Sequence, residues 1–249
     1  RAVFTSTTFS MTSAGLMTLN GAKGAGATSD AVRLSGTPAG GVVNAAGGLA
    51  VNGTGDVVVD TGSIIHAGTG AMFKATNNIV FSANSAFAPS TTGAVNVTLN
   101  SDSDGLNGGA ISLATGSVVS SNGGNITLGG GADPATTAAI GASAATSAMA
   151  SGIYLDAASL NAGAGNISLR GAGIAGANGA YGIYMTGGSL QTTTGSISLT
   201  GLGGAGGPSG SSDMGIGLYN AASITSTSGN IALTGTGNGA TLGIGVGAW

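Results

Sequence analysis

The sequence predicts an all-β chain folded as a three-sided parallel β-solenoid with glycine-rich loop excursions. The first observation is composition: glycine supplies 51 of the 249 residues and proline only 4. The second is a strand-like phrase of alternating apolar and polar residues, bounded by glycine clusters that leave no room for ordinary helices. The third is the regular spacing of the apolar anchors within these phrases. The phrase recurs at Asn96–Leu99, Ala110–Leu113, Asn125–Leu128, Asn166–Leu169, Ser196–Leu199 and Asn230–Leu233.

The anchors come in sets of three, about seven residues apart, as one coil with three strands requires. The sets are Ile111, Val118 and Ile126; Ile153, Leu160 and Ile167; Ile183, Leu190 and Ile197; and Leu218, Ile224 and Ile231, with Ile244 opening another. The first anchors follow one another at intervals of 42, 30, 35 and 26 residues. The variation lies in an excursion after the third strand, which is typical of solenoid repeats.

The N-terminal half is predicted to form tighter coils. Its anchors advance by seven or eight residues: Val42, Leu49, Val57, Ile64, Met72 and Ile79. We divide one continuous solenoid into residues 1–40, a strand-rich start and candidate assembly segment; 41–110, with coils of about 22 residues; and 111–249, with coils of 26–42 residues and Gly/Ala/Ser-rich excursions. Roughly nine coils at ~4.8 Å each predict a rod of about 40 Å.

The corners of such a coil need residues that accept a positive φ, and glycine and asparagine do so most readily. Asparagine stands directly before isoleucine at Asn78, Asn125, Asn166 and Asn230. These side chains either form a hydrogen-bonded ladder from coil to coil or serve only as turn formers. The longest excursion, Ala132–Ser151, is predicted to be a loop or flap with one helical turn.

The composition excludes several classes of protein. The chain has 5 basic and 8 acidic residues and an isoelectric point of about 4.5, so nucleic acid is not an expected partner. Every apolar run is too short for a transmembrane helix. The chain has no cysteine and a single histidine, His66, so no thiolate or multi-histidine metal site forms and no cofactor is expected. We interpret His66 as an exposed or capping side chain.

Two groups of aspartates are the candidates for chemistry. Asp56 and Asp60 bracket three valines, the pattern of a strand flanked by turns, and we interpret both as structural. Asn100, Asp102 and Asp104, followed by glycine, match the first half of a calcium loop, but the bidentate glutamate of a complete loop is missing. This segment is either a weak calcium site or a turn rich in Asn and Asp.

Three tyrosines recur beside the first anchors of successive coils. Tyr154, Tyr184 and Tyr219 are about 30 residues apart, which predicts an aromatic stripe along one face of the rod. The stripe either binds a glycan or packs against a neighbouring molecule. The simpler alternative is the ordinary preference of tyrosine for strands.

The two ends of the chain are predicted to serve assembly. The sequence stops within Leu242–Trp249, one strand into a new coil, and it starts with a strand-like segment, Arg1–Thr5. An unfinished coil accepts a further strand from more of the same polypeptide or from an identical subunit. A head-to-tail contact of the second kind does not close and produces a filament. The residues expected in this contact are Val3, Phe4, Ile244, Val246 and Trp249.

From about residue 40 onwards, the order of the phrases resembles the large filamentous-haemagglutinin-like exoproteins of Gram-negative bacteria. The resemblance is carried by Val97–Asp104, Gly109–Leu113 and Ser121–Leu128, and units such as Thr227–Gly235 are similar to the beta strand repeat sections of these proteins. It implies a right-handed parallel β-helix, secretion by a two-partner or related route, and a role as a surface adhesin or fibre. Such proteins usually run to thousands of residues, and their N-terminal secretion domain is not evident in residues 1–40.

Three functions follow from these patterns. The first is a secreted, non-catalytic structural β-solenoid, a subunit or segment of an extracellular fibre or cell-surface adhesin, whose main partner is another copy of itself. The second is an adhesin module that binds host glycans or a surface through the tyrosines or the excursions. The third is a β-helical carbohydrate-active enzyme, which the scattered aspartates and the absence of glutamate disfavour.

Overall fold

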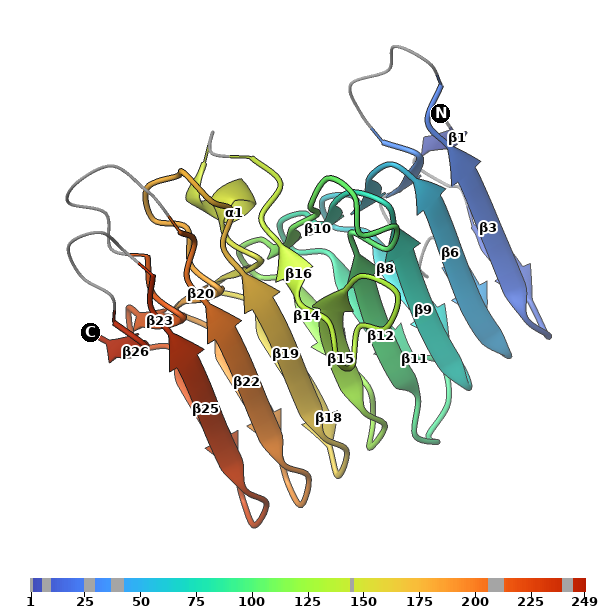
Figure 1. The fold of residues 1–249 in the computed structure, drawn as a ribbon. Helices are drawn as coiled ribbons and strands as arrows, with labels where there is room; N and C mark the ends of the chain where they lie inside the picture. The colour runs from blue at the N-terminus through green and yellow to red at the C-terminus, as the bar shows by residue number, and fades with distance from the viewer. Residues whose placement is uncertain are drawn as a thin grey trace.

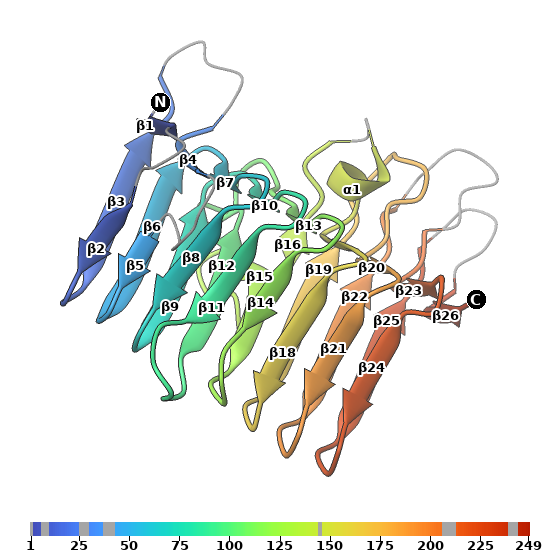
Figure 2. The same cartoon turned by 180° about the vertical axis from the view of Figure 1, so that it is seen from behind.

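The computed structural model describes residues 2–5, 10–24, 30–36, 43–143, 146–205, 213–238 and 244–249, with the backbone alone at 2–5 and 147. These residues form a three-sided parallel β-solenoid, as the sequence predicted. The chain passes through three sheets in turn, and each strand pairs in parallel with the corresponding strand of the next coil (Figure 1). The view from behind shows the strands stacked along one axis (Figure 2). The backbone hydrogen bonds of the sheets therefore run along the rod.

The first sheet opens each coil and carries a column of β-branched residues. Its strands are β1 (Ala2–Thr5), β4 (Val32–Ser35), β7 (Val57–Val59), β10 (Ile79–Phe81), β13 (Ile111–Leu113), β17 (Ile153–Asp156), β20 (Ile183–Thr186), β23 (Ile216–Tyr219) and β26 (Val246–Ala248). Five fully buried isoleucines stack in register along it: Ile79, Ile111, Ile153, Ile183 and Ile216. Identical branched side chains pack well on a pleated surface, so the column fixes the register of the coils.

The second sheet forms the next side of the rod and places one large residue per strand in the core. Its strands are β2 (Met11–Ser13), β5 (Val43–Ala45), β8 (Ile64–Ala67), β11 (Ala86–Pro89), β14 (Val118–Ser120), β18 (Ser159–Gly163), β21 (Ser189–Thr192) and β24 (Ser223–Ser226). Leu160, Leu190 and Ile224 share one register position, as their place as the second anchor of each set predicted.

The third sheet has the longest strands and closes each coil. Its strands are β3 (Met17–Ala22), β6 (Gly48–Thr54), β9 (Gly70–Ala75), β12 (Asn96–Ser101), β15 (Ile126–Gly130), β19 (Ile167–Ala172), β22 (Ile197–Leu202) and β25 (Ile231–Thr236). The predicted anchors Ile126, Ile167, Ile197 and Ile231 form one column here. With three strands per coil, the described residues make eight coils, and β26 begins a ninth.

The longest excursion leaves the rod between β15 and β17. It contains a short strand, β16 (Ala139–Ile140), which pairs with β19, and a four-residue helix, α1 (Ser147–Ala150). The predicted single helical turn is therefore confirmed, whereas β16 has no periodic signal because two residues cannot show one. Ala150 packs with Ala177, Ala180 and Ile174 into a small apolar cluster beneath the excursions.

Successive sheets meet closely where each coil passes from the third sheet to the first. At Gly201 in β22, an added Cβ would lie 2.0 Å from the carbonyl oxygen of Gly215, which precedes β23. Gly201 pairs in register with Gly171 and Gly235 in the neighbouring coils. This column of glycines is required because backbone from the next coil occupies the space of a side chain.

Several predicted anchors lie one residue from the true inward position. Ile65, Phe73 and Val119 are fully buried, whereas the predicted Met72 and Val118 are 38% and 39% exposed. Each error falls where two or three apolar residues follow one another, so alternation alone does not identify the inward face. The predicted anchor Val42 lies outside the described residues.

The register of the C-terminal coil also differs from the prediction. Ile183 pairs with Ile216 rather than with Leu218, and Ile216 pairs with Val246 rather than with Ile244. The first-strand intervals are therefore 42, 30, 33 and 30 residues. A shift of two residues keeps the same side chains inward, so the anchor pattern alone could not detect it.

An asparagine ladder runs along the corner before the third sheet. Asn125 donates its backbone N–H to Asn96 Oδ1 at 2.8 Å, and Asn166 donates to Asn125 Oδ1 at 2.9 Å. The ladder continues through Ser196 to Asn230. The ladder interpretation is therefore confirmed for three of the four predicted asparagines. The fourth, Asn78, bonds from coil to coil at a different corner, before the first sheet: its N–H donates to Asp56 Oδ1 at 3.0 Å, and its Oδ1 accepts from the Ala110 N–H at 2.9 Å.

Candidate functional site

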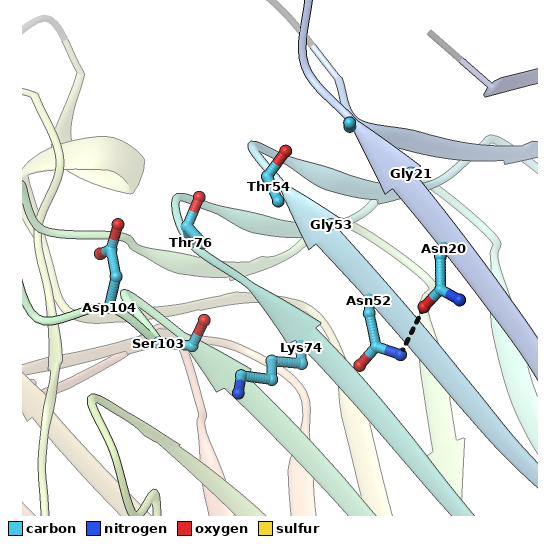
Figure 3. Close-up of a pocket in the computed structure, with 10 residues that line it drawn as sticks. Asn20, Gly21, Asn52, Gly53, Thr54, Lys74, Thr76, Ser103 and Asp104 are labelled. Carbon is cyan, nitrogen blue, oxygen red and sulfur yellow. Dashed lines mark hydrogen bonds between the residues drawn. The ribbon is translucent and has the colours of Figure 1, made fainter.

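A groove of about 560 Å³ lies over the outer face of the third sheet in the N-terminal half (Figure 3). Asn20, Asn52 and Lys74 occupy the same outward position in β3, β6 and β9, and form its floor. Asn52 Nδ2 donates to Asn20 Oδ1 at 2.9 Å. The turn after β12 supplies Asp104 at the far end. Successive side chains of a strand point to opposite faces of the sheet. Residues that share a register position in neighbouring strands therefore point to the same face, as these three do.

The groove carries one positive and one negative side chain that do not pair with each other. The ion pairs found among the described residues all involve Arg33, and none involves Lys74 or Asp104. Figure 3 shows the Lys74 ammonium and the Asp104 carboxylate pointing in different directions. The floor therefore offers amide donors and acceptors beside the ammonium group of Lys74, which forms no ion pair. This arrangement suits hydrogen bonding to a polar or anionic ligand.

The excursion after β15 separates this groove from a second one over the same sheet. The second groove, of about 320 Å³, lies over β19, β22 and β25. Arg170 on its floor donates from Nε to the carbonyl oxygen of Ala135 in the excursion, at 2.6 Å. The excursion also covers Gly129, where an added Cβ would lie 2.1 Å from the Pro134 carbonyl oxygen.

The half calcium motif is placed at the end of β12. Asn100 is 4% exposed and Asp102 is 2% exposed, whereas Asp104 lies on the surface. Burial raises the pKa of the Asp102 carboxyl, and the charge of Asp104 raises this pKa further, while backbone N–H groups of residues 106–108 lower it. The described residues contain no group of three His, Cys, Asp or Glu side chains that could hold a metal ion. The residues of the motif thus lie close in the chain but in different environments.

The other candidate aspartates make structural contacts, as predicted. Asp56 Oδ1 accepts hydrogen bonds from the Asn78 backbone and side chain, both at 3.0 Å. Asp60 Oδ1 accepts from Arg33 Nη1 at 2.8 Å, and Arg33 also pairs with Asp30. The hydrogen bond to Asp30 and, after it, the one to Asp60 raise the pKa of Arg33, against the opposing effect of burial.

His66 lies on the second sheet and is half-buried. Its Nδ1 donates to the carbonyl oxygen of Ala88 in the neighbouring coil at 3.0 Å. The side chain therefore bridges two coils, which agrees with a capping role.

The predicted tyrosines belong to a larger aromatic strip on the outer face of the first sheet. The strip consists of Tyr154, Tyr181, Tyr184, Tyr219 and Trp249. Tyr181 stacks on Tyr184 with ring centroids 4.6 Å apart, and Trp249 stacks on Tyr219 at 5.0 Å and 11° between the planes. Because neighbouring rings cover one another's faces, much of the strip is packed within the chain.

The three predicted tyrosines do not share one register position. Tyr154 pairs with Tyr184, but Tyr184 pairs with Gly217, and Tyr219 lies two residues further along β23. The rings still meet because Gly217 has no side chain: an added Cβ would lie 2.9 Å from Tyr219 Cε2. The glycine thus leaves room for the ring of Tyr219 to reach back towards Tyr184.

The hydroxyl groups of the strip are partly removed from water. Burial raises the pKa values of Tyr154, Tyr181 and Tyr184 above the usual range, and the effect is greatest for Tyr181, whose hydroxyl lies 3.3 Å from that of Tyr219. These phenols therefore stay neutral under ordinary conditions. The strip presents apolar rings and uncharged hydroxyl groups.

The predicted assembly residues lie at opposite ends of the rod. β1 pairs with β4 and β26 pairs with β23, so each has one paired side among the described strands. Val246 is 40% exposed and Trp249 is 62% exposed, whereas Ile244 is half-buried. The side chains of Val3 and Phe4 lie outside the described residues, and the assembly contact stays a prediction.

No family model, curated protein or solved structure matches the chain. The resemblance to filamentous-haemagglutinin-like exoproteins therefore stays a prediction. In the part of the chain that the structure describes, no helix is long and apolar enough to cross a membrane.

Sequence reasoning missed the groove and two members of the strip. Asn20, Asn52 and Lys74 follow the inward residues Leu19, Val51 and Phe73 by one position, and this offset was the available signal. Tyr181 and Trp249 break the 30-residue spacing of the other tyrosines. They join the strip because they reach it from a loop and from a neighbouring coil.

Proposed function

We propose that the chain is a secreted, non-catalytic structural β-solenoid, a segment or subunit of an extracellular fibre or bacterial cell-surface adhesin. The observation that carries this proposal is the uninterrupted stacking of eight coils into one rod (Figure 1). Each coil is a template for the next, because its backbone N–H and C=O groups point along the rod axis and are paired by the following coil. A fold of this kind extends by adding coils, which is the property that a fibre or stalk needs.

The scarcity of charge supports the same proposal. Only 13 of the 249 residues carry a formal charge, and three of these, Arg33, Asp30 and Asp60, neutralise one another in part. Repulsion between two rods that approach side by side is therefore weak. Another copy of the chain is the partner that such a surface suits best.

The location is proposed on the sequence resemblance. Filamentous-haemagglutinin-like exoproteins are exported through a two-partner or related route as unfolded chains, and the absence of cysteine agrees with that route. The location that we propose is therefore outside the bacterial cell.

Electron microscopy and sedimentation of the purified chain test the structural proposal. We expect fibres with an axial repeat of about 40 Å, from eight to nine coils at ~4.8 Å each. Val246→Lys places a charge on the outermost described strand of the first sheet and should shorten the fibres. Val118→Lys, at a residue with nearly the same exposure in the middle of the rod, is the matched control. Stable monomers at high concentration would refute self-assembly.

Glycan binding is the second candidate, and the groove over the third sheet favours it. Aligned amides and hydroxyl groups beside Lys74 suit the hydroxyl and acidic groups of a polysaccharide. On a glycan array, Asn52→Ala and Lys74→Ala should each reduce binding. Thr225→Ala, an exposed change on the second sheet, should leave binding unchanged. Equal binding by all three variants would exclude the groove as the glycan site.

A further inference from the structure

Two buried oxygen atoms at the end of β12 have no hydrogen-bond partner. They are Asn100 Oδ1 and Asp102 Oδ1, from residues that are 4% and 2% exposed. A buried polar oxygen without a partner is costly. Backbone N–H groups of residues 106–108 bond to the Asp102 carboxylate, but they leave Oδ1 without a hydrogen bond. Three other such oxygens occur singly among the described residues, on Ser117, Ser151 and Asp213. Only at the end of β12 do two stand within three residues of each other, and such a pair calls for a specific explanation, such as a bound ion.

The backbone of Asp102 is held firmly at the end of β12. Asp102 has a φ of 46°, an unusual value for a residue other than glycine. Its N–H donates to the Asn77 carbonyl oxygen at 3.2 Å. Its own carbonyl oxygen accepts from Gly105 and Gly131, at 2.8 and 3.1 Å. These bonds join the turn to the preceding coil and to the excursion after β15.

Asn100 reaches the same end of β12 from the outer face of the third sheet. It pairs in register with Lys74 on one side and with Gly129 on the other. Since the excursion lies against Gly129, its residues 134–137 close over this end of the row. Asn100, beside Gly129 in the same row, is buried, and its Oδ1 has no hydrogen-bond partner.

A third oxygen donor, Asp104, stands two residues beyond Asp102. It is exposed, and its Oδ1 accepts a hydrogen bond from the Leu106 N–H at 3.3 Å. Its negative charge acts on Asp102, so the two carboxylates repel each other when no cation is present. Lys74 lies in β9, the strand of the preceding coil that pairs with β12, and Figure 3 shows its ammonium pointing away from Asp104.

We propose that this turn binds a calcium-class divalent cation, with Asp102 Oδ1 as the anchoring ligand. Asn100 Oδ1 and the Asp104 carboxylate are the other side-chain ligands, and water completes the shell of six to eight oxygens that calcium takes. The cation satisfies the two buried oxygens and cancels the repulsion between the carboxylates. The cation stabilises the turn, whose backbone is bonded through Gly131 to the excursion that divides the two grooves. The proposal does not depend on the proposed fibre.

The ligand set fixes the expected affinity. Two carboxylates and one amide on a partly exposed turn correspond to a dissociation constant of about 10⁻⁴–10⁻³ M, the range of extracellular calcium modules. Calcium at about ten times this constant lowers the ratio of unfolded to folded chain by a factor of about 11.

Calorimetric titration and thermal unfolding of the full chain test the site. The probes are calcium chloride, magnesium chloride and sodium chloride at matched ionic strength. We expect saturable binding of one calcium and a higher melting temperature in the wild-type chain. Asp102→Asn and Asp104→Asn should each abolish both effects. Asp133→Asn should retain them, because Asp133 caps an exposed turn by accepting from the Ala135 N–H and has no buried oxygen beside it.

The proposal fails if the wild-type chain shows no saturable calcium binding, a measurement that does not depend on how any variant folds. It also fails if calcium and magnesium raise the melting temperature equally in the wild type and in Asp104→Asn, since that is a general ionic effect. An Asp102→Asn chain that is more stable than the wild type in saturating calcium would show that a proton, not a cation, occupies the site.

Discussion

The four N-terminal coils and the four C-terminal coils fill the same cross-section in different ways. In the N-terminal coils, one phenylalanine from each sheet meets at the centre: Phe81 and Phe87 lie 5.5 and 6.2 Å from Phe73, in edge-on contacts. In the C-terminal coils, columns of isoleucine and leucine fill the core, and every aromatic side chain described lies outside, in the strip. One backbone geometry therefore accepts two kinds of core.

The sorting of aromatic residues follows from their polar atoms. Phenylalanine has none, so three rings can be buried together without an unpaired group. Tyrosine and tryptophan carry a hydroxyl or an N–H that needs a partner or water, so they remain on the outer face. The difference between the halves teaches that shape fixes the coil, whereas hydrogen-bonding capacity decides which face a ring occupies.

The largest expected effect tests the aromatic core. Phe81→Ala removes a fully buried ring and should lower the free energy of unfolding by about 3–5 kcal/mol. Ile183→Val, in a column of identical residues, should cost about 0.5–1.5 kcal/mol. Urea denaturation followed by circular dichroism measures both. Equal losses would mean that the phenylalanines are not the centre of the N-terminal core.

The next effect concerns the glycine column at the corner. Gly201→Ala should cost about 1–3 kcal/mol, because the new Cβ would lie 2.0 Å from a backbone oxygen that cannot rotate away. Gly53→Ala should cost less, since its Cβ would meet side-chain atoms of Val57 and Ala31 at 2.9 and 3.2 Å. Gly15→Ala, with nothing within 4 Å, is the control. Urea denaturation of the three variants gives their free energies of unfolding. A Gly201→Ala variant as stable as the wild type would disprove the close approach.

A smaller effect separates the two asparagine corners. Asn78→Ala should cost about 1.5 kcal/mol, because Asn78 bonds to the Asp56 carboxylate and also accepts from the Ala110 N–H at 2.9 Å. Asn166→Ala should cost about 0.5–1 kcal/mol, since its ladder bonds are neutral and exposed to water. Thermal unfolding of both variants provides the measurement. The reverse order would show that the ladder, rather than the Asp56 corner, stabilises the rod.

The smallest effect is a loss of stability at alkaline pH, which we expect from the C-terminal coils because they contain the tyrosines. All four tyrosines lie in the C-terminal coils, and burial raises the pKa values of Tyr154, Tyr181 and Tyr184. The folded chain keeps protons that the unfolded chain loses above pH 10, so these groups stabilise the fold below that pH and the contribution is lost as pH rises further. Ultraviolet absorbance should show the phenolates of Tyr154, Tyr181 and Tyr184 forming at a higher pH than in the unfolded chain. Ordinary titration of Tyr154, Tyr181 and Tyr184 would contradict the packing of the strip.

Much of the fold follows from spacing and alternation in the sequence. The seven-residue interval between Leu160 and Ile167 is long enough for one short strand and one corner. Because three anchors at this interval come before each excursion, the pattern predicts a coil with three sides. The asparagines of the third-sheet corner were recognised for the same reason, since they recur at a fixed offset from an anchor. The errors at Met72 and Val118 arose where consecutive apolar residues obscure alternation.

The candidate sites were less accessible to the sequence. Asn100, Asp102 and Asp104 were recognised as a motif, but only the structure shows that two of their oxygens are buried without partners. Lys74 carried no motif at all, because its neighbours in the groove, Asn20 and Asn52, are more than 20 residues away in the chain. Sequence offsets predict which face a residue occupies, but not what covers that face.

By itself, the sequence determined the sheet type, the number of sides and most of the inward columns, because these depend on local alternation and on a repeat that survives variable loops. The tertiary structure alone decided the pairing register of β23 and β26, the meeting of Tyr184 with Tyr219 across Gly217, and the close approach of the excursion to Gly129. These features depend on which coil lies beside which. A register shift of two residues changes such contacts while leaving every inward side chain inward.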